Sequence, residues 1–258
     1  MRKTRAKHWR KGSILWIVSI SVALAGIMLA YTSYLDLKKR EVEDRIWVIF
    51  GACGVILQIY GIYSGATVPL ILGISVGLAS VIGLGIFFLG LYGGADAKAL
   101  IVLAVVLPYF QPRVGLYAIA PVIILTNGIL LSMFLPGGLF LLNVTRLVRS
   151  QPIFEGFREP AYRKILACLL GYKSAGKPRG FQFSMERNVV QEQSNPSLSN
   201  SLTKKFDFTF MQDEFETKPG TWVTPGIPLL VFFAAGFIAL LTYGDLVIGL
   251  VQFLAGML

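Results

Sequence analysis

The chain has 258 residues, of which 55% are hydrophobic and 15% charged, and its formal net charge is +10. A soluble domain of this length cannot bury so much apolar surface, so the composition excludes an ordinary soluble enzyme and indicates an integral membrane protein. The basic residues are spread along the chain and form no stripe interleaved with aromatic residues. This distribution argues against nucleic acid as a partner and favours anionic membrane lipids.

Apolar segments long enough to cross about 30 Å of hydrocarbon predict most of the helices. They are residues 13–34, 46–63, 68–91 and 114–144. Residues 97–107 and 224–243 add two more, so we expect an all-α polytopic membrane protein with about six transmembrane helices. Residues 246–258 are apolar but too short to cross, which fits a re-entrant or interfacial segment.

These helices imply four regions. We expect a basic N-terminal tail in residues 1–12, transmembrane helices 1–5 in residues 13–148, a soluble domain in residues 149–222, and the sixth helix with the short apolar segment in residues 223–258. The small soluble domain is therefore inserted before the last long helix.

The soluble domain has the patterns of an α+β fold. Its apolar residues repeat at helical spacing between Pro160 and Gly171, which predicts an amphipathic helix. Phenylalanines alternate with polar residues in 181–183 and 206–210, as in half-buried strands. Residues 188–201, rich in Ser, Asn and Gln, predict a mobile loop.

The sequence offers few metal ligands. Cys53 lies in an apolar segment and Cys168 in the soluble domain, so we expect two inert thiols and no disulfide. The single histidine, His8, lies in the basic tail, and there is no Cys-x-x-Cys pair. We expect no metal and no cofactor.

Two aspartates, Asp36 and Asp96, lie at the ends of apolar segments. A carboxylate at the edge of a membrane span is costly, so it is taken as functional by default. Alternating six helices across the bilayer places both aspartates and the soluble domain on one face. Most basic residues of the loops lie on that face, which indicates the cytoplasm, although the basic tail lies opposite. Asp245, at the other face, is expected to be a turn or helix cap.

Three motifs resemble archaeal preflagellin (archaellin) peptidases, relatives of the type IV prepilin peptidases among the membrane Gly-x-Gly-Asp aspartyl proteases. The first is Asp36 followed by Arg40-Glu41-Val42-Glu43-Asp44 and Trp47, and the second is Gly93-Gly94-Ala95-Asp96. The third is the run of residues 222–228 that opens the last long helix. The resemblance covers nearly the whole chain after the basic tail.

Two departures from the family pattern matter. Ala95 stands where the pattern has glycine, which requires a helical or extended backbone there. The cysteine loop of many bacterial relatives is absent, so we expect a peptidase without their additional N-methylation activity.

The resemblance implies a membrane aspartyl endopeptidase with Asp36 and Asp96 as its catalytic dyad and Gly93, Gly94 and Ala95 as the motif backbone. Its implied substrates are archaellin or pilin precursors, cut on the cytoplasmic face of the cell membrane between a short basic leader and a hydrophobic helix. Glu41 and Glu43 either bind that leader or complement a helix dipole in its first turn.

Three other functions compete with this interpretation. A presenilin-like intramembrane protease would carry a Pro-Ala-Leu motif, which the chain lacks, and would hold its aspartates deep in the bilayer. A proton-coupled transporter would also pair carboxylates, but many transporters show an internal repeat that this chain lacks. A non-enzymatic subunit of filament assembly differs from a peptidase only in activity.

Overall fold

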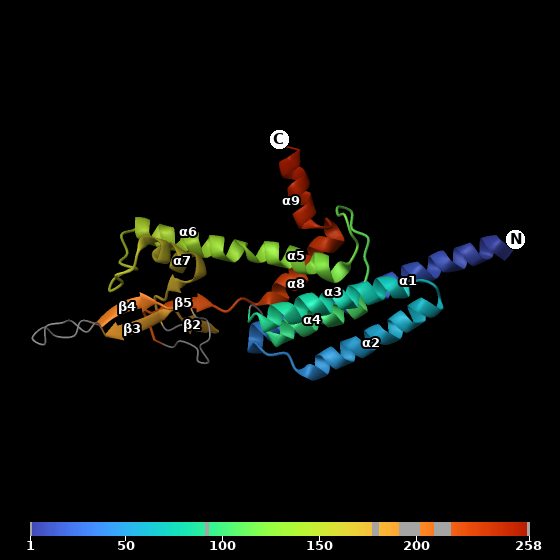
Figure 1. The fold of residues 1–258 in the computed structure, drawn as a ribbon, viewed down its shortest axis with the longest axis horizontal. Helices are drawn as coiled ribbons and strands as arrows, with labels where there is room; N and C mark the ends of the chain where they lie inside the picture. Colours follow the sequence, from blue (N-terminus) through green and yellow to red (C-terminus); the bar gives the residue numbers. More distant parts are fainter. Residues whose placement is uncertain (1, 91–92, 177–180, 191–201, 209–217, 257–258) are drawn as a thin grey trace, which may run out of the picture. The chain divides into compact units, whose positions relative to one another are not determined.

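The computed structural model describes residues 2–90, 93–176, 181–190, 202–208 and 218–256 (Figure 1). Contacts divide the chain into two compact units. The first unit comprises Met1–Ser132 and Pro228–Leu258, and the second comprises Met133–Ile227. The predicted domain of residues 149–222 falls inside the second unit, which also includes the preceding helix.

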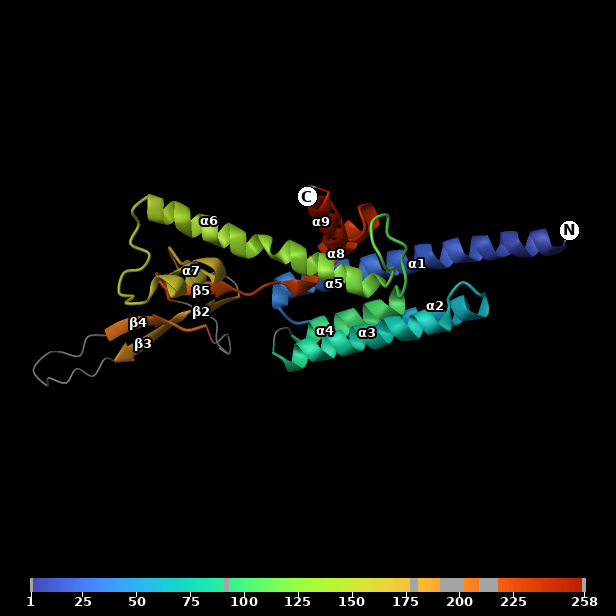
Figure 2. The same cartoon turned by 45° about the horizontal axis from the view of Figure 1, so that its top comes forward.

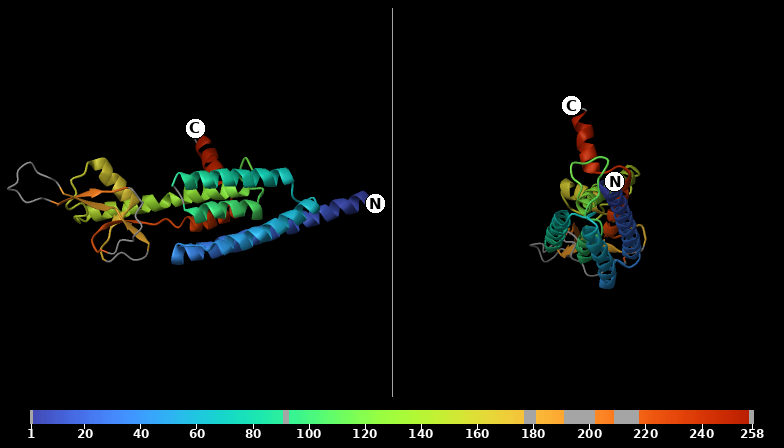
Figure 3. Two further views of the ribbon diagram at one scale, coloured as in Figure 1. Left: turned by 60° about the horizontal axis from the view of Figure 1, so that its bottom comes forward. Right: turned by 90° about the vertical axis from the view of Figure 1, so that its right-hand side faces the viewer.

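Helices are the named elements of the first unit. They are α1 (Arg2–Lys39), α2 (Asp44–Tyr63), α3 (Pro69–Phe88), α4 (Gly94–Val106), α5 (Ala120–Ser132), α8 (Leu229–Thr242) and α9 (Leu246–Ala255). Helices α1 to α4 run side by side, and α9 points away from them (Figures 1 and 3). The predicted tail of residues 1–12 is helical from Arg2 onward.

The interior of this unit is apolar and so is much of its outer surface. Met28, Leu103, Ile124 and Phe233 are at most 1% exposed and belong to one core cluster. Large apolar side chains also cover the outward faces of α2 and α3, where Ile56 is 69% exposed. Such a surface is stable only against another apolar phase, so it is the surface expected to contact lipid.

In the described part of the chain, four stretches are long and apolar enough to cross a membrane. They are Leu15–Lys39, Asp44–Tyr63, Pro69–Phe88 and Ala120–Val148. Helices α4 and α8, with 13 and 14 residues, are shorter than the length usually needed to span a bilayer. The structure therefore supports a multi-pass membrane protein with four full-length spans.

Two predicted helices begin later than expected, and proline accounts for the later start of the second. Residues 114–119 are not helical, and the helix after them is interrupted at Met133, because the Pro136 ring conflicts with the carbonyl of Ser132 four residues earlier. Residues 224–228 do not open a helix either. Pro225 ends a strand, and α8 begins only after Pro228.

The second unit combines helices with two small sheets (Figure 2). It contains α6 (Phe134–Val148), α7 (Ala161–Leu170), β1 (Tyr172–Lys173), β2 (Gln182–Ser184), β3 (Glu186–Val190), β4 (Leu202–Phe206) and β5 (Trp222–Pro225). One sheet has the order β1-β5-β2, and β3 pairs with β4; all pairings are antiparallel. Trp222 is fully buried, stacks on Phe154 and donates its indole N–H to the carbonyl of Ile153 at 2.7 Å.

The local predictions for this unit have mixed outcomes. The amphipathic helix is confirmed as α7, which follows Pro160 and ends at Gly171. The strand predictions are confirmed for β2 and for Phe206 in β4, whereas Phe208 follows the end of that strand. The predicted loop was wrong for residues 188–190, which lie in β3; its remaining residues, 191–201, lie outside the described part, as does Phe210.

Candidate active site

Asp36 lies in the last turn of α1, where its carboxylate meets Arg40. The carboxylate Oδ1 is 3.8 Å from a guanidinium nitrogen of Arg40, four residues later, and the Asp36 side chain is 14% exposed. Arg40 itself has φ = 57°, the left-handed conformation that commonly ends a helix, and its N–H donates to the Asp36 carbonyl. Arg40 thus terminates α1 and directs its guanidinium back to Asp36.

Asp96 lies in the first turn of α4 and closes on the residue before the helix. Its Oδ2 accepts a hydrogen bond of 3.1 Å from the backbone N–H of Gly93, which is half of a capping box. A Cβ at Gly93 would lie 3.4 Å from this oxygen, which is an ordinary van der Waals contact. Gly94 and Ala95 are the first residues of α4, and the helical backbone that alanine requires at position 95 is present.

Arg40 connects the two aspartates electrostatically. The charges of Asp36 and Arg40 both interact electrostatically with the Asp96 carboxylate. The charge of Arg40 also interacts with the Asp36 carboxylate. The carboxyl end of α1 and the amino end of α4 therefore bring both carboxylates and one cation to the same end of the first unit. This is the juxtaposition that the sequence predicted for the aspartates.

The beginning of α8 completes this end of the unit. Ser33, one turn before Asp36, donates its hydroxyl to the carbonyl of Leu230 at 2.8 Å. The backbone N–H of Leu230, in the first turn of α8, favours the negatively charged form of the Asp36 carboxylate. Asp36 therefore ends its own helix yet faces the amino end of another, where a negative charge is favoured. Among the described residues its buried Oδ2 has no hydrogen-bond partner.

The acidic residues after Asp36 divide into two groups. Asp44, in the first turn of α2, forms an ion pair of 2.6 Å with Lys98 of α4. Glu41 and Glu43 are exposed and precede that helix, and the Glu43 side chain makes no capping hydrogen bond. Asp44 is thus the residue that complements the helix dipole, whereas Glu41 and Glu43 present their charge to solvent.

Sequence reasoning assigned no role to Arg40, Ser33 or Leu230. The Asp36 and Arg40 spacing of four residues, typical of helical ion pairs, was a usable signal for Arg40. Ser33 gave no signal, because its partner lies 197 residues away in the sequence.

The described residues offer little support for a metal site or for a cysteine nucleophile. They contain no group of three His, Cys, Asp or Glu side chains placed to hold a metal ion. Both cysteines are free, and burial raises the pKa of the Cys168 thiol to about 11, so it remains protonated at neutral pH and is no nucleophile.

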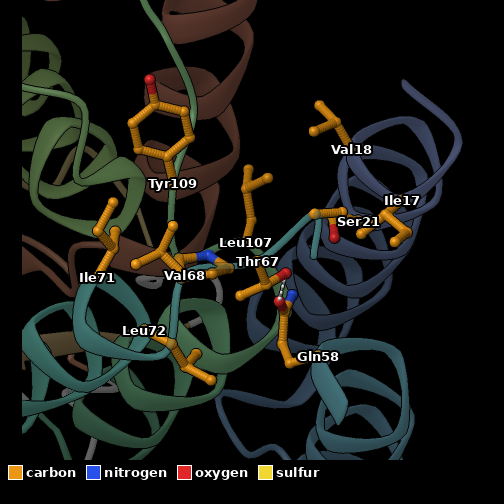
Figure 4. Close-up of a pocket in the computed structure, with 12 residues that line it drawn as sticks. Ile17, Val18, Ser21, Gln58, Thr67, Val68, Ile71, Leu72, Leu107 and Tyr109 are labelled. Carbon is orange, nitrogen blue, oxygen red and sulfur yellow. Dashed lines mark hydrogen bonds between the residues drawn. The ribbon is translucent and has the colours of Figure 1, made fainter. Parts of the chain in front are cut away.

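A separate cavity of about 280 Å³ lies at the opposite end of the same helices (Figure 4). Its lining includes Ile17 of α1, 19 residues and therefore about 28 Å of helix before Asp36. Gln58 and Thr67 are hydrogen-bonded to one another in its wall at 2.9 Å. This cavity is distinct from the aspartate site.

Comparison with known proteins agrees with this geometry. Residues 23–142, which include both aspartates, match the type IV leader peptidase family. The chain is 27% identical to a preflagellin peptidase of Methanocaldococcus jannaschii over 91% of its own length and 97% of the relative's. It is 25% identical to the preflagellin peptidase of Methanococcus voltae, over 91% and 99% of the two chains. The chain is therefore similar to type IV leader peptidases over 120 of its 258 residues, and these similarities support a membrane protease.

Proposed function

We propose that Asp36 and Asp96 are the catalytic dyad of an aspartyl endopeptidase that removes the leader peptide from preflagellin-like precursors. The observation that carries this proposal is the meeting of two carboxylates from the ends of α1 and α4 within one unit. The names of the relatives indicate preflagellins as substrates.

The two carboxylates supply what peptide hydrolysis needs. An ionised carboxylate accepts a proton from a water molecule as that water attacks the scissile carbonyl, and a protonated carboxyl donates to the carbonyl oxygen. Neighbouring carboxylates share one proton readily, because ionising both places like charges together. Arg40 and the amino end of α8 stabilise negative charge at Asp36, and Gly93 does so at Asp96.

The position of the dyad at helix ends suits a substrate with one apolar helix. Such a precursor can place its helix against the apolar outer faces of α2 and α3 while the segment before that helix reaches the dyad. Within this proposal the exposed Glu41 and Glu43 attract the basic leader, and the dyad lies at the cytoplasmic face.

The test is cleavage of a preflagellin by the purified full-length protein. We expect Asp36→Asn and Asp96→Asn each to lower kcat by at least about a thousandfold, because an asparagine side chain can serve neither as a general acid nor as a general base. The matched control is Asp245→Asn at the other end of the unit. Asp245 caps α9 through its Oδ1, and asparagine is an equally good cap, so this variant should retain activity.

Two outcomes would contradict the proposal. Cleavage that survives either dyad substitution in a folded protein would remove the aspartyl mechanism. Failure of the parent protein to cleave any precursor with a basic leader and an apolar helix would remove the proposed substrate class.

A further inference from the structure

The second unit contains an open pocket of about 580 Å³ that the peptidase chemistry does not use. It lies where the end of α6, the turn after it and the end of β1 meet. The lining residues are Leu142, Thr145, Arg146, Arg149, Gln151, Pro152, Ile153, Lys173, Ser174 and Ala175.

The pocket carries positive charge without compensation from its own walls. Arg146, Arg149 and Lys173 line it, and no acidic residue does. The ion pairs found in the described part of the chain involve none of these three. Three like charges around one hollow repel one another and create a positive potential that attracts an anion.

Two of these cations are held in place by the backbone. Arg146 donates to the carbonyl of Lys173 at 2.5 Å and lies over the ring of Tyr172. Lys173 donates from Nζ to the carbonyl of Pro152 at 3.0 Å. Each bond uses one of several donors, so both groups retain N–H donors for a further acceptor. A phosphate group, with several anionic oxygens, matches such an arrangement.

The dipole of α6 accounts for only part of this cluster. Basic residues in the last turn of a helix complement its negative end, which explains Arg146 and Arg149 without any ligand. Lys173 belongs to β1, however, and its charge converges on the same pocket from another element. A pocket that collects cations from two elements is better explained by an anion that binds between them.

The position of the pocket along α6 identifies the source of that anion. The candidate membrane span Ala120–Val148 ends between Arg146 and Arg149, two of the residues that line the pocket. The end of an apolar span is where the chain leaves the hydrocarbon and meets the lipid headgroups. Apolar side chains remain exposed there, with Val148 at 79% and Leu147 at 44%.

We propose that this pocket binds the phosphate of an anionic membrane lipid headgroup through Arg146, Arg149 and Lys173. Lipid bound there would attach the second unit to the membrane surface. Basic pockets at the ends of membrane helices are a general means of recognising anionic lipids.

The test measures binding of defined lipids to the full-length protein in detergent by native mass spectrometry. The probes are phosphatidylglycerol, the zwitterionic phosphatidylcholine and inorganic phosphate. Arg149→Gln removes an exposed charge, and the double variant with Lys173→Gln removes two. The matched control is Arg158→Gln, which removes an exposed charge of the same unit outside the pocket. Circular dichroism and thermal melting identify variants that fail to fold.

We expect tight binding of phosphatidylglycerol that weakens about fivefold for each charge removed, as for a basic residue near an anionic surface. The control should bind like the parent. Equal binding of phosphatidylglycerol and phosphatidylcholine, or equal binding by the folded pocket variants and the parent, would overturn the proposal. Inorganic phosphate binding as tightly as phosphatidylglycerol would overturn the lipid as the source and leave a site for a soluble anion.

Discussion

The two ends of the first unit both carry buried polar groups, but these groups are used differently. At the end away from the aspartates, the Asn127 amide donates to the carbonyls of Gly236 and Gly244, and its oxygen accepts from the N–H of Leu246 at 2.8 Å. Gln58, 3% exposed, donates to the carbonyl of Val106. Most of their partners, the carbonyls of Val106 and Gly244 and the N–H of Leu246, are backbone groups at or beside helix ends, so the role of these amides is structural.

At the aspartate end the polar groups are the carboxylates of Asp36 and Asp96 and the guanidinium of Arg40. Asp96 accepts a hydrogen bond from the N–H of Gly93, and Asp36 has Arg40 at 3.8 Å and one buried oxygen without a hydrogen bond among the described residues. Asp245 also has such an oxygen, yet its other oxygen caps α9. An unpaired oxygen alone therefore does not mark a catalytic group, and the proposed dyad rests on the second carboxylate beside Asp36.

Removing the charge of Arg40 tests this contrast most strongly after the dyad itself. We expect Arg40→Gln to lower kcat about 10- to 100-fold with little change in KM, because an interaction of about 1.5–3 kcal/mol with a charged group is lost at the reacting carboxylates. Arg40→Lys should restore part of the activity. Peptide cleavage at saturating substrate measures both.

Arg45→Gln, at an exposed position of α2, is the matched control and should behave like the parent protein. If Arg40→Gln lowers the thermal stability but leaves kcat of the folded enzyme unchanged, Arg40 only terminates α1. The contrast between the two ends would then be restricted to the aspartates.

At the opposite end, removing an amide should cost stability and not catalysis. Asn127→Leu removes the side-chain partner of the Gly244 carbonyl and of the Leu246 N–H, so we expect about 1–3 kcal/mol of destabilisation, and less for Gln58→Leu. Thermal unfolding in detergent measures the loss, with Gln252→Leu on the exposed face of α9 as the control. A lowered kcat in folded Asn127→Leu would show that this end also serves the reaction.

The sequence predicted the aspartate end better than the elements around it. Hydrophobicity, which is a local property of the chain, placed Asp36 and Asp96 at helix ends, and alternation of the expected spans placed them on one face. The approach of α8 to Asp36 depends on packing between residues 197 apart, which no local pattern contains. Residues 224 and 225 were predicted as the start of a helix, but pairing with β2 makes them part of the strand β5.

The smallest expected effect concerns Glu41 and Glu43, which the structure leaves exposed beside the dyad end. Reversing both charges with Glu41→Lys and Glu43→Lys should raise KM about twofold to fivefold for a precursor with a basic leader, the range of exposed ion pairs. The increase should disappear with a precursor whose leader lysines are neutralised, because no charge remains to be repelled. Glu155→Lys, an exposed reversal in the second unit, is the control. An unchanged KM for the basic leader would leave these glutamates without a role in substrate binding and confine recognition to the apolar helix of the precursor.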